Sequence, residues 1–183
     1  MPSALQRFVR KIATWPIAAL GLVLYLLLSS GFEARKEAFG GIKSLDARQW
    51  YTPDEARDFF QHLDARNLRQ TYAATELTLD LAFPCVYWAL FSVFLFHLYS
   101  PARLRLLLLI PFGAAVCDLC ENSIAAYLAW SFDGAASSLA TLGAQFTAAK
   151  TALLILALLL TAFGSLSALL RRSRLPPRSD EAR

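Results

Sequence analysis

The sequence contains few charged residues for its length. Charged side chains make up 17% of its 183 residues and hydrophobic ones 56%, whereas a typical soluble domain has about 25% charged residues. This deficit argues against a soluble domain and favours a membrane protein. The net charge of +4 does not indicate nucleic-acid binding, because no basic patch is interleaved with aromatic residues.

Histidine is also scarce, and this argues against several kinds of catalytic or metal site. His62 falls in a predicted loop and His97 at a predicted helix end, so no zinc or haem site is expected. The Glu-x-x-His motif of di-iron bundles and the Gly-x-Ser-x-Gly motif of serine hydrolases are both missing. We therefore expect no cofactor, no bound metal and no Ser-His-Asp triad; oxygen ligands around a hard cation remain an alternative.

Cysteine is limited to three residues, two of which form a Cys-x-x-Cys motif at Cys117 and Cys120. Such a motif usually works at a helix N-terminus, where the helix dipole lowers the pKa of a thiol. Here it lies within a long predicted helix beside carboxylates, and no loop cysteine exists to relay electrons. We interpret these cysteines as small packing residues and not as a redox pair.

Long apolar runs, in contrast, are abundant. A membrane-spanning helix needs about 20 largely apolar residues, and four segments qualify: 12–32, 76–99, 104–130 and 146–170. The first segment is a long run with no clear small-x-small cleavage site after it, so we interpret it as a retained helix and not a signal peptide. The predicted fold class is all-α, with a four-transmembrane-helix bundle forming one membrane domain over 1–170 and a disordered tail over 171–183.

The distribution of Lys and Arg predicts the orientation of the four spans. Ten basic residues lie in the N-terminal segment, the short second connection and the tail: Arg7, Arg10, Lys11, Arg103, Arg105, Arg171, Arg172, Arg174, Arg178 and Arg183. In the loop over 33–75 acidic residues match the basic ones in number, and the connection over 131–145 has no Lys or Arg. Both termini are therefore predicted to be cytoplasmic, in the cell inner (plasma) membrane, with the long loop outside.

The long outer loop is predicted to contain an amphipathic helix. Thr52 can cap its start, Pro53 suits the first helical position, and Glu55 completes a capping box. Apolar residues then recur at helical spacing, so the helix is expected to lie on the membrane surface or to cap the bundle. Asn67 is a suitable left-handed terminator, and a new helix is expected to begin near Leu68.

The predicted spans carry polar residues on shared helix faces. Asp118, Glu121 and Asn122 follow i, i+3, i+4 spacing in the third span, while Glu76 and Asp80 lie one turn apart at the start of the second. Tyr72 and Tyr87 continue approximately the second face, and the fourth span contributes Lys150 beside two threonines. We predict that these residues form a ligand-binding site: Glu76, Asp80, Asp118, Glu121, Asn122, Lys150, Tyr72 and Tyr87.

The depth of these residues supports one common site. At about 1.5 Å per residue, three spans bring their polar groups to overlapping depths in the outer half of the bilayer. A charge at the bilayer centre costs about 2.5–3.5 kcal/mol, so Asp118 and Glu121 should face the bundle interior and either pair or stay protonated. Lys150 is a natural partner, but the sequence does not show whether it reaches the acids. Pro84 cannot donate to the carbonyl of Asp80, which leaves a backbone acceptor beside the acids.

The pattern Arg69-x2-Tyr72-x3-Glu76-x3-Asp80-x3-Pro84-x2-Tyr87, followed by Asp118-x2-Glu121-Asn122, covers about a third of the chain. It resembles a pattern in uncharacterised bacterial four-helix integral membrane proteins. The resemblance implies that these polar residues belong together in a four-helix membrane architecture, and it implies no activity.

From the residues, we expect a multi-pass membrane protein with a buried acidic pocket that binds a lipid-like or other small ligand, or that handles protons. A membrane enzyme is the first alternative, with Asp118, Glu121 or Asp80 as the catalytic general acid or base. The second alternative is a structural subunit that packs against a protein partner. Expected partners are membrane lipids and a small lipid-like ligand or a protein, but not nucleic acid.

Overall fold

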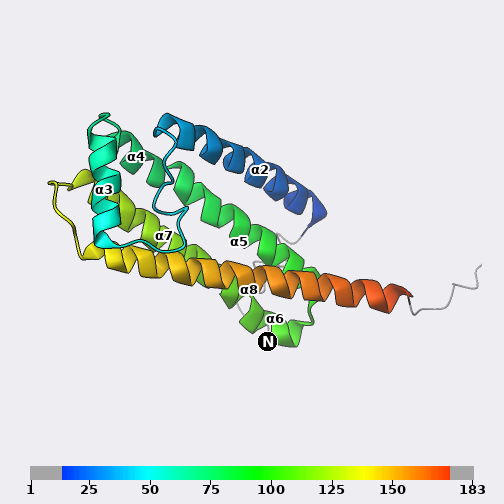
Figure 1. The fold of residues 1–183 in the computed structure, drawn as a ribbon. Coiled ribbons are helices and arrows are strands. Elements are labelled where there is room, and N and C mark those ends of the chain that lie inside the picture. The colour runs from blue at the N-terminus through cyan, green and yellow to red at the C-terminus, as the bar shows by residue number, and fades with distance from the viewer. Residues whose placement is uncertain (1–13, 174–183) are drawn as a thin grey trace, which may run out of the picture.

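The computed structural model describes residues 14–173, and within that range the chain forms helices and no strand. Figure 1 shows the helices in their arrangement. Their bounds are α2 (Trp15–Ala38), α3 (Pro53–Asp64), α4 (Arg69–Glu76), α5 (Leu79–Leu98), α6 (Pro101–Leu107), α7 (Leu109–Trp130) and α8 (Leu139–Ser173). The all-α prediction is confirmed; the predicted disorder over 174–183 and the first residues of the first predicted span lie outside the described residues.

Within the described residues, three helical stretches are long and apolar enough to cross a membrane. They are α4 with α5 (Arg69–Leu98), α7 (Leu109–Trp130) and most of α8 (Leu139–Arg171). The apolar part of α2, Ala19–Gly31, is shorter. Three of the four predicted spans therefore coincide with helices of spanning length, and the first coincides with a helix whose apolar part is below the usual length.

The third predicted span, 104–130, is divided into two helices. α6 ends at Leu107 and α7 begins at Leu109. Pro111 accounts for the break, because it has no N–H to donate to the carbonyl of Leu107 four residues earlier.

α3 begins and ends as its sequence predicts. The Thr52 hydroxyl accepts a hydrogen bond from the Glu55 N–H at 3.2 Å, and the Glu55 carboxylate accepts one from the Thr52 N–H at 2.7 Å, which completes the capping box. After the helix, Asn67 adopts a left-handed conformation with φ of 57°. The N–H of Leu68 returns to the carbonyl of Leu63 at 2.9 Å, so the chain turns sharply into α4.

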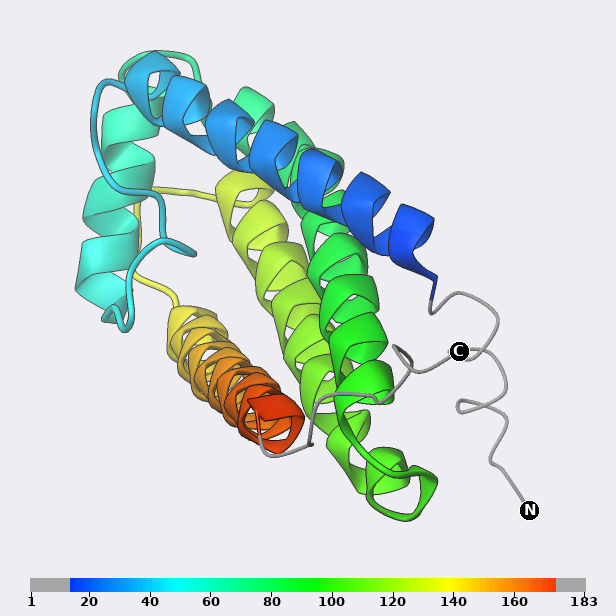
Figure 2. The same ribbon diagram turned by 90° about the vertical axis from the view of Figure 1, so that its right-hand side faces the viewer.

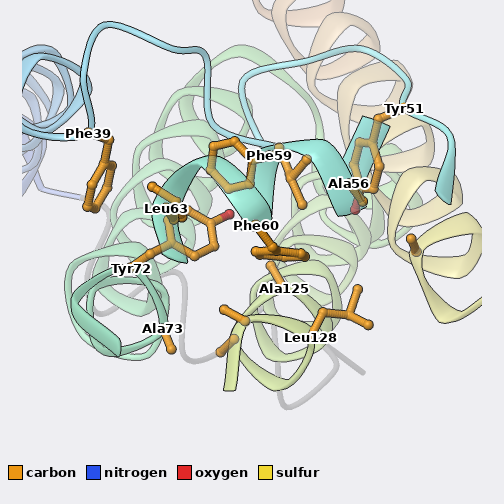
Figure 3. Packing of buried hydrophobic residues seen from close by; sticks show 14 of the residues in the cluster. Phe39, Tyr51, Ala56, Phe59, Phe60, Leu63, Tyr72, Ala73, Ala125 and Leu128 are labelled. Atoms are coloured by element: carbon orange, nitrogen blue, oxygen red, sulfur yellow. The ribbon is translucent and has the colours of Figure 1, made fainter. Parts of the chain in front are cut away.

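α3 lies across one end of the bundle (Figure 1), and a hydrophobic cluster holds it there. Its buried residues, including Phe59, Phe60 and Leu63, pack against Tyr72 of α4 and against small residues of α7 and α8. Figure 3 shows the aromatic part of this cluster, in which the rings of Phe59 and Tyr72 meet edge to face with centroids 5.1 Å apart. The predicted amphipathic helix therefore caps the bundle. We call this the α3 end and the opposite end the α6 end.

The remaining helices lie lengthwise beside one another (Figure 2). α7 packs against both α5 and α8, and α2 packs against α5. α2 and α8 therefore flank α5 without a comparable contact between themselves. This arrangement leaves room for a groove between α2 and α8, with α5 as its floor.

Candidate functional site

Lys150 joins two carboxylates inside the bundle. Its Nζ lies 3.0 Å from Oδ1 of Asp118 and 2.5 Å from Oε2 of Glu121. Asp118 and Glu121 lie one turn apart on α7 and point to Lys150 on α8, and all three residues are buried. An unpaired charge at this position would be costly, so the pairing is what makes these three residues compatible with a buried interface.

The other oxygens of the two carboxylates also have partners. The Tyr87 hydroxyl, from α5, donates to Oδ2 of Asp118 at 3.0 Å. The Thr147 hydroxyl, one turn before Lys150 on α8, donates to Oε1 of Glu121 at 2.6 Å. Three helices thus meet in one set of polar contacts, which we call the acidic network: Tyr87, Asp118, Glu121, Asn122, Thr147 and Lys150.

Asn122 connects the acidic network to the backbone of α5. Its Nδ2 donates to the carbonyl of Asp80 at 2.8 Å. Pro84 has no N–H to offer this carbonyl, so the side-chain amide replaces the missing helical hydrogen bond. The free acceptor predicted from Pro84 is confirmed, and Asn122 is the group that uses it.

The other predicted site residues, Tyr72, Glu76 and Asp80, lie on α4 and at the start of α5. Asp80 and Glu76 are both buried near the start of the same apolar stretch, and Asp80 meets the network through its carbonyl. Tyr72 lies in the aromatic cluster beneath α3 and packs against Phe39, Phe59 and Phe60. Binding of a ligand by the predicted set stays a prediction.

Sequence reasoning missed two residues of the outer loop, Tyr51 and Asp46, that lie toward the acidic network. Burial, with a smaller contribution from the charge of Glu121, raises the pKa of the Tyr51 hydroxyl above its usual value, so Tyr51 remains a neutral donor. Gly143 makes room for that hydroxyl, because a Cβ at this position would collide with it. The charge of Asp46, in the same loop, contributes in a small way to the raised pKa of Tyr51.

An apolar groove adjoins the network on the side facing α2. It has a volume of about 360 Å³ and is lined by α2, α5 and α8. Tyr25 of α2 stacks on Phe83 of α5 in its wall, with ring centroids 5.3 Å apart. Tyr87 also lines this groove while its hydroxyl bonds to Asp118. Tyr87 is therefore the side chain shared by the groove and the network.

The cysteines and acids do not form an evident metal site. Across residues 14–173, no group of three or more His, Cys, Asp and Glu side chains is placed to hold a metal ion. Cys117 and Cys120 lie in the middle of α7, half-buried and free, while Cys85 is exposed on α5. The placement of the Cys-x-x-Cys motif within a helix agrees with its interpretation as packing.

Comparison with known proteins adds no assignment to this geometry. No family model matches the chain, and no curated protein or solved structure matches it either.

Proposed function

We propose that this protein is a multi-pass membrane protein that binds a small lipid-like molecule beside its acidic network. The proposed spans are α2, α4 with α5, α7 and α8, with both termini in the cytoplasm and the α3 end outside. The apolar length of three of these helices supports the proposal. The charge distribution supports the orientation: ten Lys and Arg residues lie in the N-terminal segment, the second connection and the tail, whereas the connection over 131–145 has none.

The observation that carries the ligand proposal is the position of Tyr87. Its ring lines the apolar groove, and its hydroxyl donates to Asp118. A molecule with an apolar chain would place the chain in the groove, where the lining is aliphatic and aromatic. The polar end of that molecule would then lie beside the hydrogen bond between Tyr87 and Asp118, which is the polar contact of Tyr87 among the described residues.

The charge of the network restricts the chemistry of the ligand. Asp118 and Glu121 are two carboxylates that share one lysine. A further negative charge would be repelled there, whereas a hydroxyl, amide or amine can donate a hydrogen bond to Asp118. The proposed ligand is therefore a neutral or cationic lipid-like molecule with a hydrogen-bond donor at its polar end.

The test is native mass spectrometry of the purified protein, with extraction and identification of any bound lipid. Tyr87→Phe keeps the ring but removes the hydroxyl, whose oxygen can accept a hydrogen bond from the ligand's donor, and should reduce ligand occupancy several-fold, since a hydrogen bond contributes about 0.5–1.5 kcal/mol. Tyr25→Phe is the matched control, because Tyr25 lines the same groove and lies outside the acidic network. Equal occupancy in the wild type and both variants would contradict the proposal.

Proton handling is a second candidate, favoured by the same excess of acid over base. Two buried carboxylates on one lysine retain a negative charge that a single proton would neutralise. The infrared band of a protonated carboxyl should then change with pH in the wild type and be lost in Asp118→Asn combined with Glu121→Gln. A pH-independent spectrum in the wild type would exclude this role.

A further inference from the structure

A second cavity lies at the α6 end, remote from the acidic network. It has a volume of about 590 Å³ and is formed by the end of α5, the start of α6 and the last turns of α8. Its polar lining residues are two arginines, two serines, one histidine and one tyrosine: Arg103, Arg171, Ser100, Ser167, His97 and Tyr99. The polar lining therefore consists largely of hydrogen-bond donors, and two of them carry a fixed positive charge.

These arginines have no acid to neutralise them nearby in the chain. No Asp or Glu occurs over 81–117 or over 134–179, the segments that hold all of these polar lining residues. The ion pairs recorded among the described residues are formed by Arg57, Arg69 and Lys150, and so do not include Arg103 or Arg171. Two guanidinium groups that form no ion pair with another described residue, beside hydroxyls, are suited to a phosphate group, which takes two parallel hydrogen bonds from each guanidinium.

The walls of this cavity are held together by direct contacts between α5 and α8. The Tyr99 hydroxyl donates to the carbonyl of Leu160 at 2.7 Å. Gly164 allows the close approach, because a Cβ there would lie 3.0 Å from the Tyr99 ring and 3.1 Å from Leu98. Arg103 lies on α6, where the neighbouring Leu104 is buried in a cluster that Leu160 of α8 packs against, so packing also fixes the segment that carries Arg103.

The level of the cavity along the bundle indicates the source of the phosphate. Arg171 is the last residue of the apolar stretch of α8, and Arg103 follows the end of α5 by one turn. Phe163 is also in the lining, is 67% exposed, and lies about 12 Å from Arg171 along the helix. A phospholipid whose phosphate lies at the arginines would extend its acyl chains along this exposed apolar surface, whereas a free phosphate would leave that surface uncovered.

We propose that this cavity binds the phosphate of an anionic phospholipid from the cytoplasmic leaflet, through Arg103 and Arg171 with Ser100 and Ser167 as additional donors. Basic pockets at the cytoplasmic ends of membrane helices have the right charge and position for such headgroups. This inference uses the membrane orientation proposed above but does not depend on a ligand at the acidic network.

The experiment measures lipid retained by the protein after extraction from nanodiscs that contain phosphatidylglycerol and phosphatidylcholine in equal amounts. Arg103→Gln combined with Arg171→Gln should lower phosphatidylglycerol retention by about tenfold or more, because each guanidinium–phosphate hydrogen bond is charge-assisted. Arg103→Lys combined with Arg171→Lys keeps the charge but loses the paired hydrogen-bond geometry of the guanidinium. Its phosphatidylglycerol retention should lie between those of the wild type and the double Gln variant. The thermal unfolding of each variant in detergent verifies that it folds.

The matched control is Lys43→Gln combined with Arg57→Gln, which removes the same charge at the α3 end. This control should retain phosphatidylglycerol as the wild type does, and so should Tyr87→Phe, which tests the other site. Equal loss in the control, or equal retention of the two lipids by the wild type, would overturn the proposal. Displacement of phosphatidylglycerol by glycerol 3-phosphate in solution would also overturn it and would assign the cavity to a soluble phosphate ester.

Discussion

The interior near the α3 end and the α6 end of the bundle differ in how their charged side chains are neutralised. In the interior of the bundle, below the α3 end, the acids Asp118 and Glu121 are buried, and their oxygens are matched by Lys150, Tyr87 and Thr147. At the α6 end, Arg103 and Arg171 line an open cavity with no acid nearby in sequence. A buried charge needs a partner within the chain, whereas an exposed charge can be neutralised by water, ions or a bound ligand. The α3 end is therefore expected to respond to mutation through stability, and the α6 end through what it binds.

The largest effect is expected at Lys150. Lys150→Met fills a similar volume but leaves Asp118 and Glu121 without their cation, and removing one partner of a buried ion pair costs about 3–5 kcal/mol. Thermal unfolding in detergent should occur well below the wild-type temperature. Adding Asp118→Asn and Glu121→Gln to Lys150→Met should recover most of the loss, because the orphaned carboxylates are removed. A Lys150→Met variant as stable as the wild type would remove the contrast between the two ends.

A smaller loss is expected at Asn122. Asn122→Leu leaves the carbonyl of Asp80 buried without a donor, which costs about 1–3 kcal/mol. Pro84→Ala supplies a backbone N–H to that same carbonyl. The double variant Pro84→Ala with Asn122→Leu should therefore lose less unfolding free energy than the sum of the losses of the two single variants. A double-mutant cycle of unfolding free energies measures this coupling. Strict additivity would show that the two groups do not share the acceptor.

The residues of the acidic network could be predicted largely because few arrangements are open to them. Asp118 and Glu121 share a face of a long apolar helix, and Lys150 occurs at a matching depth on another. The cost of burying any of them alone required either a partner or a protonated acid, and the structure shows that the partner is Lys150. Pro84 identified the carbonyl of Asp80 for a similar reason, since a missing N–H is visible in the sequence.

Other parts of the site were beyond sequence reasoning. Tyr51 and Asp46 lie in an irregular loop with no helical period, so their approach to the network depends on how α3 packs. Thr147 lies on the face of Lys150, but a threonine hydroxyl often bonds within its own helix, as it also does here to the carbonyl of Gly143 at 3.1 Å. The groove depends on the position of α2, whose apolar surface has no polar stripe to indicate which side packs.

A further prediction concerns the junction between α3 and the rest of the bundle. Arg69 pairs with Asp64 at 2.7 Å and donates to the carbonyls of Ala129 and Phe132 at the end of α7. Arg69→Gln should therefore weaken the attachment of the α3 end by about 1–3 kcal/mol and increase amide exchange over 129–138. Arg66→Gln is the control, because its contacts are to His62 within α3. Unchanged exchange over 129–138 would show that the hydrophobic cluster alone holds this end.

The smallest effect is expected at the capping box of α3, which is exposed and separate from both sites. Thr52→Ala should cost about 1 kcal/mol, localised to the first turn of α3.

The capping box also predicts a pH dependence. The Thr52 N–H and then its hydroxyl hold the pKa of Glu55 below its usual value. Because the folded pKa is the lower one, this stabilisation is present at neutral pH and is lost as the pH falls through it. Protection factors of the amides over 54–56 should therefore fall on acidification in the wild type, and somewhat less in Thr52→Ala, which keeps the Thr52 N–H and loses only the hydroxyl. Any accompanying change in exchange near Asp118 would show that the acidic network depends on how α3 is seated and not on its own contacts alone.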